Sequence, residues 1–283
     1  KLVLILLFCA VIAIWGNSPQ QLNFAPQPGD EKLLFSGAFA VALIYVNYAY
    51  TGWNAATYVT GELDNPQRNL PIVLFVGTTL VMLLYLMLNA TFLSAAPASS
   101  LEGKLQVGVI VAESALGPEA GRAMGAVLAL LLISTVSAMT MAGPRVLQMI
   151  GQDFDVFSKL AKCNDQGLPA NAVIFQGLLA VAFIISATFE SVLIFSSFVL
   201  GINTLFSVLG VFVLRFKKLN ISGAYKTTGY PVAPLIYLSV TMWTLAYVLI
   251  SRPTEGLIGL GIIVLGGLVY AFSTNKTEQD SGR

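Results

Sequence analysis

Histidine is absent from this chain of 283 residues, and charged residues make up only 10% of it. Without imidazole, the chain has no HExxH zinc motif, Ser–His hydrolytic pair, histidine-ligated haem or imidazole proton relay. The net charge is +1 and no basic stripe indicates nucleic acid. The two cysteines, Cys9 and Cys163, fall in a predicted span and a predicted loop. Neither a disulfide nor a metal site is therefore expected, and no cofactor.

Hydrophobic residues make up 56% of the chain. A soluble domain carries about a quarter charged residues, so this composition indicates an integral membrane protein. Apolar windows between polar, proline-rich or glycine-rich connections predict an all-α polytopic protein with one transmembrane domain, 1–273, and a polar tail, 274–283. About eight segments are expected, near 2–16, 35–62, 70–96, 122–149, 170–188, 190–214, 232–252 and 255–273, joined by the connections 17–34, 63–69, 97–121, 150–169 and 215–231.

The first segment is short for a membrane span. Its apolar run from Lys1 to Gly16 covers about 21 Å, against a hydrocarbon core of about 30 Å. The chain also begins with Lys instead of Met. We therefore expect a fragment in which this helix begins before Lys1.

The distribution of Lys and Arg among the loops predicts the orientation. The positive-inside rule places the richer set of loops in the cytoplasm, so the C-terminus is expected inside a plasma or bacterial inner membrane and 17–34 outside. The richer set carries Arg68, Arg145, Lys159, Lys162, Arg215, Lys217, Lys218, Lys226, Lys276 and Arg283, and the other set Lys32, Lys104, Arg122 and Arg252.

Polar residues interrupt the second predicted segment at "YAYTGWNAATY", residues 48–58. The apolar half 35–50 and the shorter half 55–62 together exceed one span. One interpretation is a simple kink with small residues for helix packing. The other is a discontinuous helix, because backbone unwinds at membrane depth only where protein or a water-filled cavity receives its polar groups. The first half would then aim carbonyl oxygens at a cationic group.

Several stretches resemble the amino acid–polyamine–organocation superfamily of transporters, and most of all the bacterial relatives of the L-type amino acid transporters. These are "FAVALIYVNYAYTGWNAATYVTGELDNPQRNLP", "GPRVLQMIGQDFDVFSKL", "LPANAVIFQG", "GVFVLRFKK" and "YKTTGYPVAPLIYL". The resemblance covers essentially the whole chain, from the family's fifth helix to its twelfth. It implies the LeuT-like fold of inverted repeats, here truncated and without the family's helices one to four.

The resemblance also implies a substrate site. The unwound carbonyls of Tyr48, Ala49 and Thr51, next to Gly52, would receive the substrate's ammonium group. Neutral carbonyls suit this role because a carboxylate is costly in lipid. Tyr48 matches an aromatic gate, although an interfacial aromatic is the alternative. Thr51 replaces a family glycine, so its methyl and hydroxyl groups should narrow the pocket or add a hydrogen bond.

Three further residues match pocket positions of the family. Asn54 would support the unwound region or line the pocket. Tyr85 would bring its hydroxyl near the substrate or the unwound backbone, with a plain core tyrosine as the alternative. Gly201 stands where the family often has an aromatic residue, so the distal pocket should be larger or suit a different substrate size.

Lys1 matches a family lysine whose ammonium occupies the place that sodium takes in LeuT-like relatives. Ser134 and Thr135, with Ser137, would supply neighbouring oxygens, unless they only bond their own helix. Lys1 as a flanking anchor is the alternative. If Lys1 is the family lysine, sodium coupling is disfavoured, and proton symport and exchange both stay open. Glu62 is expected to pair with Arg68 or Arg145.

We therefore expect a secondary transporter, either a permease or an exchanger, that moves amino acids by alternating access. The alternative is a membrane sensor or partner subunit that binds amino acids without moving them. An enzyme is disfavoured because the spans hold no nucleophile–base pair, metal cluster or phosphate loop. A channel is disfavoured because no filter motif is present. The isolated chain is expected not to transport, and the amino acid, the oligomeric state and any partner subunit stay open.

Overall fold

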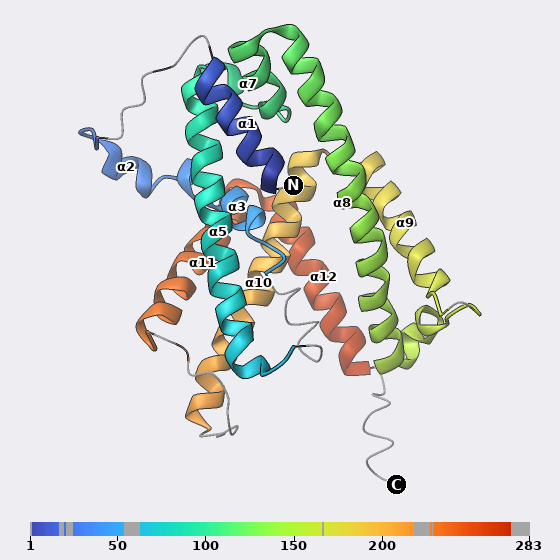
Figure 1. Ribbon diagram of the computed structural model, residues 1–283. Helices are drawn as coiled ribbons and strands as arrows, with labels where there is room; N and C mark the ends of the chain where they lie inside the picture. The colour runs from blue at the N-terminus through green and yellow to red at the C-terminus, as the bar shows by residue number, and fades with distance from the viewer. Residues whose placement is uncertain are drawn as a thin grey trace. The chain divides into compact units, whose positions relative to one another are not determined.

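Every regular element of the described residues is a helix. The computed structural model describes residues 2–16, 20, 25–53, 63–165, 167–217, 227 and 229–272. The elements are α1 (Leu2–Trp15), α2 (Asp30–Leu34), α3 (Gly37–Ala49), α5 (Pro66–Ala95), α6 (Ala98–Leu101), α7 (Val107–Leu116), α8 (Pro118–Asp153), the 3-10 helix η2 (Asp155–Ala161), α9 (Ala170–Ser186), α10 (Phe189–Phe216), α11 (Val232–Ser251) and α12 (Pro253–Phe272) (Figure 1).

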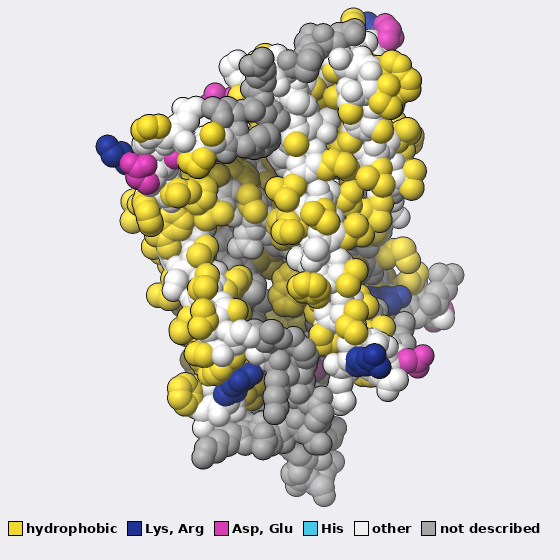
Figure 2. Space-filling model, turned by 60° about the vertical axis from the view of Figure 1, so that its left-hand side comes forward, with side chains coloured by type: hydrophobic (Ala, Val, Ile, Leu, Met, Phe, Trp, Pro, Cys, Tyr) yellow, Lys and Arg dark blue, Asp and Glu magenta, His cyan; other side chains and the backbone are white. Residues whose placement is uncertain are grey.

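Five of these helices are long and apolar enough to cross a membrane: α5, α8, α10, α11 and α12. The helices α1, α3, α7 and α9 are apolar but shorter. On the face shown in Figure 2, hydrophobic side chains cover the helices over most of their length, and charged side chains lie near helix ends. Exposed apolar flanks are expected where the solvent is lipid. The prediction of an all-α polytopic membrane protein is therefore confirmed.

Each of the eight predicted segments contains a described helix, but the connections hold more structure than the sequence indicated. The predicted connection 97–121 contains α6 and α7 as well as the start of α8. The helix α7 buries Val111, Ala112 and Ala115 on one face, while Glu113 interrupts its apolar run. At 10 residues it is too short to span a membrane and lacks a continuous apolar window. The short helices α2 and η2 likewise lie in the predicted connections 17–34 and 150–169.

The chain divides into two compact units. Unit 1 consists of residues Lys1–Pro26 and Ile72–Met139, and unit 2 of residues Gln27–Pro71 and Thr140–Arg283. In unit 1, α1 packs against α7. Its core joins Ile12 of α1 to Val111 and Ala115 of α7. Phe8 meets the ring of Phe92 edge to face at 6.2 Å.

In unit 2, α10 is the central helix. It packs against α3, α11 and α12. The core consists of Ile44 of α3, Ile194 and Phe198 of α10, and Val248 of α11, all almost fully buried. Gly259 of α12 permits this packing, because a Cβ atom there would lie 2.8 Å from Cδ1 of Phe198.

Polar contacts fix α3 against its neighbours at the end of unit 2 that the charge pattern predicts to be outside. The hydroxyl of Tyr45 donates to Oε1 of Glu190 at 3.2 Å, and the Arg252 guanidinium pairs with the same carboxylate oxygen. The hydroxyl of Tyr247 donates to the carbonyl of Phe35 at 3.3 Å. The Glu190–Arg252 pair is part-exposed and adds little stability by itself. Its effect is to position α3.

We expect Gly259→Val to destabilise unit 2 by about 1–3 kcal/mol, because its side chain would push α12 away from Phe198. The measurement is thermal unfolding of the purified protein in detergent. Gly261→Val is the matched control, since a Cβ atom at Gly261 meets nothing within 4 Å. Equal melting temperatures for the two variants would contradict the close α10–α12 contact.

Candidate functional site

The helix α3 ends where the sequence predicted a break. Its last residue is Ala49, and the amide of Tyr50 is shared between the carbonyls of Val46 at 3.3 Å and Asn47 at 3.2 Å. Gly52 follows with φ +99, a conformation that favours glycine. At 13 residues α3 is about 20 Å long, less than the hydrocarbon core of about 30 Å. If α3 starts at one membrane face, its end is expected inside the hydrocarbon core.

The carbonyl of Tyr48 at this helix end is already engaged. It accepts a hydrogen bond from the amide of Thr51 at 3.0 Å and another from the hydroxyl of Thr51 at 2.7 Å. A carbonyl oxygen has two lone pairs, so these two donors use its capacity. The predicted acceptor for an ammonium group is thus occupied by a side chain of the same turn. The sequence analysis did not predict this bond of Thr51 to its own turn.

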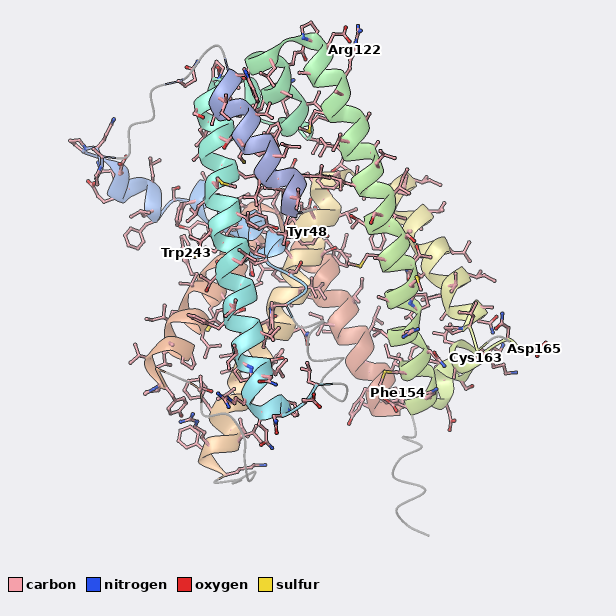
Figure 3. The ribbon with its side chains drawn as sticks, viewed as in Figure 1. Tyr48, Arg122, Phe154, Cys163, Asp165 and Trp243 are labelled. Carbon is pink, nitrogen blue, oxygen red and sulfur yellow. The ribbon has the colours of Figure 1, made fainter. Side chains whose placement is uncertain are left out.

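A cavity of about 430 Å³ lies between the end of α3 and the middle of α10, with Tyr237 of α11 also in its wall. Its volume is within the range of small-molecule sites. Figure 3 labels Tyr48 at the end of α3 that borders it. None of the described lining residues is charged. They are Asn47, Tyr48, Tyr50, Thr51, Trp53, Ser197, Leu200, Gly201, Thr204, Ser207, Val208, Val211 and Tyr237.

Ser197 is a site residue that the sequence analysis missed. It lines this cavity and also a void of about 10 Å³ between α3, α10 and α11, which is close to the space that one water needs. The residue is 6% exposed, and its Oγ has no hydrogen-bond partner in the described residues. A buried hydroxyl left unpaired costs free energy, so it is suited to meet water or a ligand. The sequence signal that could have identified Ser197 is its spacing: it lies four residues before Gly201, on the same face of α10.

The structure brings some of the predicted site residues together in unit 2. Tyr48 and Thr51 border the cavity from α3 and the turn after it, and Gly201 borders it from α10. Gly52 belongs to the same turn. Ala49 is the last residue of α3 and is not among the lining residues. A Cβ atom at Gly201 would lie 3.3 Å from Leu245, so the missing side chain also lets α10 approach α11.

The remaining predicted site residues are not tested by this cavity. Tyr85, Ser134 and Thr135 belong to unit 1. Substrate binding by Tyr85 and coupling by Ser134 and Thr135 stay predictions. The hydroxyl of Thr135 donates to the carbonyl of Leu131 at 2.9 Å, which is the self-bonding given above as the alternative. Lys1, Asn54 and Glu62 lie outside the described residues.

This chain is similar in sequence to known amino acid transporters. A family model described as "Amino acid permease" matches residues 1–274. The human b(0,+)-type amino acid transporter 1 is 27% identical over 237 residues, which cover 83% of this chain and 48% of that protein. Large neutral amino acids transporter small subunit 2 of Oryctolagus cuniculus is 30% identical over 238 residues, 83% of this chain and 43% of that protein. The chain spans about half the length of these relatives.

We expect a cysteine at Ser207 to react with a hydrophilic maleimide in proteoliposomes, because this position lines the cavity. Phe206→Cys is the matched control, since Phe206 is exposed but does not line the cavity, and lipid should shield it. Both variants are made in a background with Cys9 and Cys163 replaced by serine. Equal labelling rates for Phe206→Cys and Ser207→Cys would contradict the prediction, because position 207 would then be no more accessible to water than a position that faces lipid.

Proposed function

Because this chain belongs to the amino acid permease family, whose matched relatives are transporters and not enzymes, we propose that the whole protein moves amino acids across a cell membrane by alternating access. It would do so with the LeuT-like inverted-repeat fold in a single membrane domain, with its C-terminus in the cytoplasm. A membrane sensor or partner subunit that binds amino acids without moving them is the second candidate, since one of the matched relatives is named as a small subunit.

The observation that carries this proposal is the end of a short apolar helix beside a neutral, polar-lined cavity. The C-terminal end of a helix carries a partial negative charge, which favours an ammonium group. The described lining residues offer hydroxyl, amide and carbonyl groups and no charged side chain. Such a lining suits a ligand that brings an ammonium group of its own, since neutral donors and acceptors avoid a fixed charge in lipid.

The contact between Thr51 and Tyr48 suggests how the ligand enters. The Thr51 hydroxyl occupies the second lone pair of the Tyr48 carbonyl. The substrate's ammonium group takes the place of that hydroxyl, and the Tyr48 ring closes over it as the gate. Asn54 and Tyr85 are proposed as substrate-site residues on the family resemblance alone. Lys1, Ser134 and Thr135 hold the coupling function, either as proton symport or as exchange.

We expect Thr51→Trp to abolish uptake of labelled amino acids, because the indole ring would fill the cavity beside Tyr48. The assay uses the protein expressed from its whole reading frame and reconstituted in proteoliposomes. Thr51→Ser, which keeps the hydroxyl, should retain uptake. Uptake by Thr51→Trp at the unmodified rate would refute the pocket assignment. Saturable binding without flux in the unmodified protein would identify the sensor instead.

We expect Thr51→Val to lower the KM for uptake about fivefold, because the ammonium group no longer displaces a hydroxyl that contributes about 1 kcal/mol. Valine keeps the shape of threonine and removes only the competing donor. The measurement is the concentration dependence of uptake, with Thr51→Ser as control. A higher KM in Thr51→Val would show that the hydroxyl binds the substrate and does not compete with it.

A further inference from the structure

Another cavity of unit 2, of about 580 Å³, is a groove between the last turns of α8 and the segment that leads into α9. It shares no lining residue with the cavity beside α3. Its polar lining residues are Thr140, Arg145, Gln148 and Gln152, and Met149 and Leu168 are among the apolar ones. Figure 3 labels Phe154, Cys163 and Asp165 at this end of α8 and α9.

Two glycines and three hydrogen bonds fix the walls of the groove. A Cβ atom at Gly143 would collide with the side chain of Gln176 on α9, and one at Gly151 would lie 2.6 Å from the carbonyl of Phe157 in η2. The helices α8, α9 and η2 are thus in close contact. The following loop is tied by three bonds: Gln148 donates to Cys163 at 3.1 Å, Leu168 to Asn164 at 2.9 Å, and Asn171 to the carbonyl of Lys159 at 2.8 Å.

Within the described residues, the groove presents one positive charge, that of Arg145, without an ion-pair partner. Arg145 makes no hydrogen bond or ion pair with the part of the chain that the structure describes. Gln148 and Gln152 follow it at spacings of three and seven residues, so their amides lie on the same face of α8. Asp153 and Asp165 are near in the sequence but do not line the groove. A guanidinium group beside two amides is suited to a phosphate, which accepts paired hydrogen bonds.

The depth of Arg145 along α8 restricts the source of that phosphate. The apolar stretch 126–142 precedes it, and the helix continues for eight residues to Asp153, or about 12 Å. Arg145 is therefore expected at the headgroup level of the membrane, on the side that the charge pattern predicts to be cytoplasmic. Met149 and Leu168 give the groove an apolar wall next to its cation. Basic pockets between helices at this level bind anionic lipid headgroups.

We propose that this groove binds the headgroup of an anionic phospholipid. The guanidinium of Arg145 holds the phosphate, the amides of Gln148 and Gln152 hydrogen-bond the remaining headgroup oxygens, and the acyl chain lies along Met149 and Leu168. The site is separate from the amino acid cavity and does not depend on the function proposed for it.

The test is native mass spectrometry of the protein, expressed from its whole reading frame, after release from nanodiscs of phosphatidylcholine and phosphatidylglycerol in equal amounts. We expect Arg145→Gln to lower the retained phosphatidylglycerol about tenfold, the effect of losing a charge-assisted contact. Arg215→Gln is the matched control, because Arg215 is a cation at the same predicted side that stacks at 3.9 Å on Tyr230. Equal retention in Arg145→Gln and the unmodified protein would overturn the proposal, as would an equal loss in both variants.

A second pair of variants keeps every charge and decides the matter if Arg145→Gln fails to fold. Met149→Trp should fill the groove and lower the retained phosphatidylglycerol, whereas Met139→Trp, on the same helix but not in the groove, should not. Inorganic phosphate is then added to the unmodified protein. Displacement of the lipid by phosphate alone would mean a site for free anions and would overturn the lipid assignment.

Discussion

A main chain that leaves helical geometry inside a membrane exposes N–H and C=O groups that lipid does not satisfy, at a cost of several kcal/mol for each. The turn after α3 meets this constraint with its own residues. Tyr50 and Thr51 return their amides to the helix, and the Thr51 hydroxyl adds a second donor to the Tyr48 carbonyl. The polar groups of Tyr48, Tyr50 and Thr51 at this break are therefore satisfied within the turn. The same contact makes Thr51 the residue with which an incoming ammonium group must compete.

The helix α10 supports this site and also forms its wall. Its buried residues Ile194 and Phe198 hold α3 and α12, while Ser197, Gly201 and Thr204 face the cavity in the same stretch. Small side chains at spacings of four and three residues leave room on one face of the helix. Since the packing of the helix and the shape of the cavity depend on neighbouring residues, a change in the core of α10 will also change the wall of the site.

The sequence predicted the features that depend on local chemistry. The end of α3 followed from Thr51 and Gly52 within an apolar run, and the structure places a positive φ at Gly52. Features that depend on contacts between distant segments were not predicted. The Oγ of Ser197, which has no partner among the described residues, is buried because α3 and α11 close over α10. The helix α7 was missed because its apolar face is recognised only against α1. The occupied carbonyl of Tyr48 required the geometry of the turn itself.

The tie between Tyr45, Glu190 and Arg252 has a mechanical consequence for α3. The helix is held there and, at its start, by the bond from Tyr247 to Phe35. These two contacts hold α3 before its first residue and again in its last third, at Tyr45. The residues of this helix that lie beyond both ties are those after Tyr45, which lead into the turn with Thr51. A rearrangement beside the cavity can therefore be confined to this last turn while the rest of α3 stays in place.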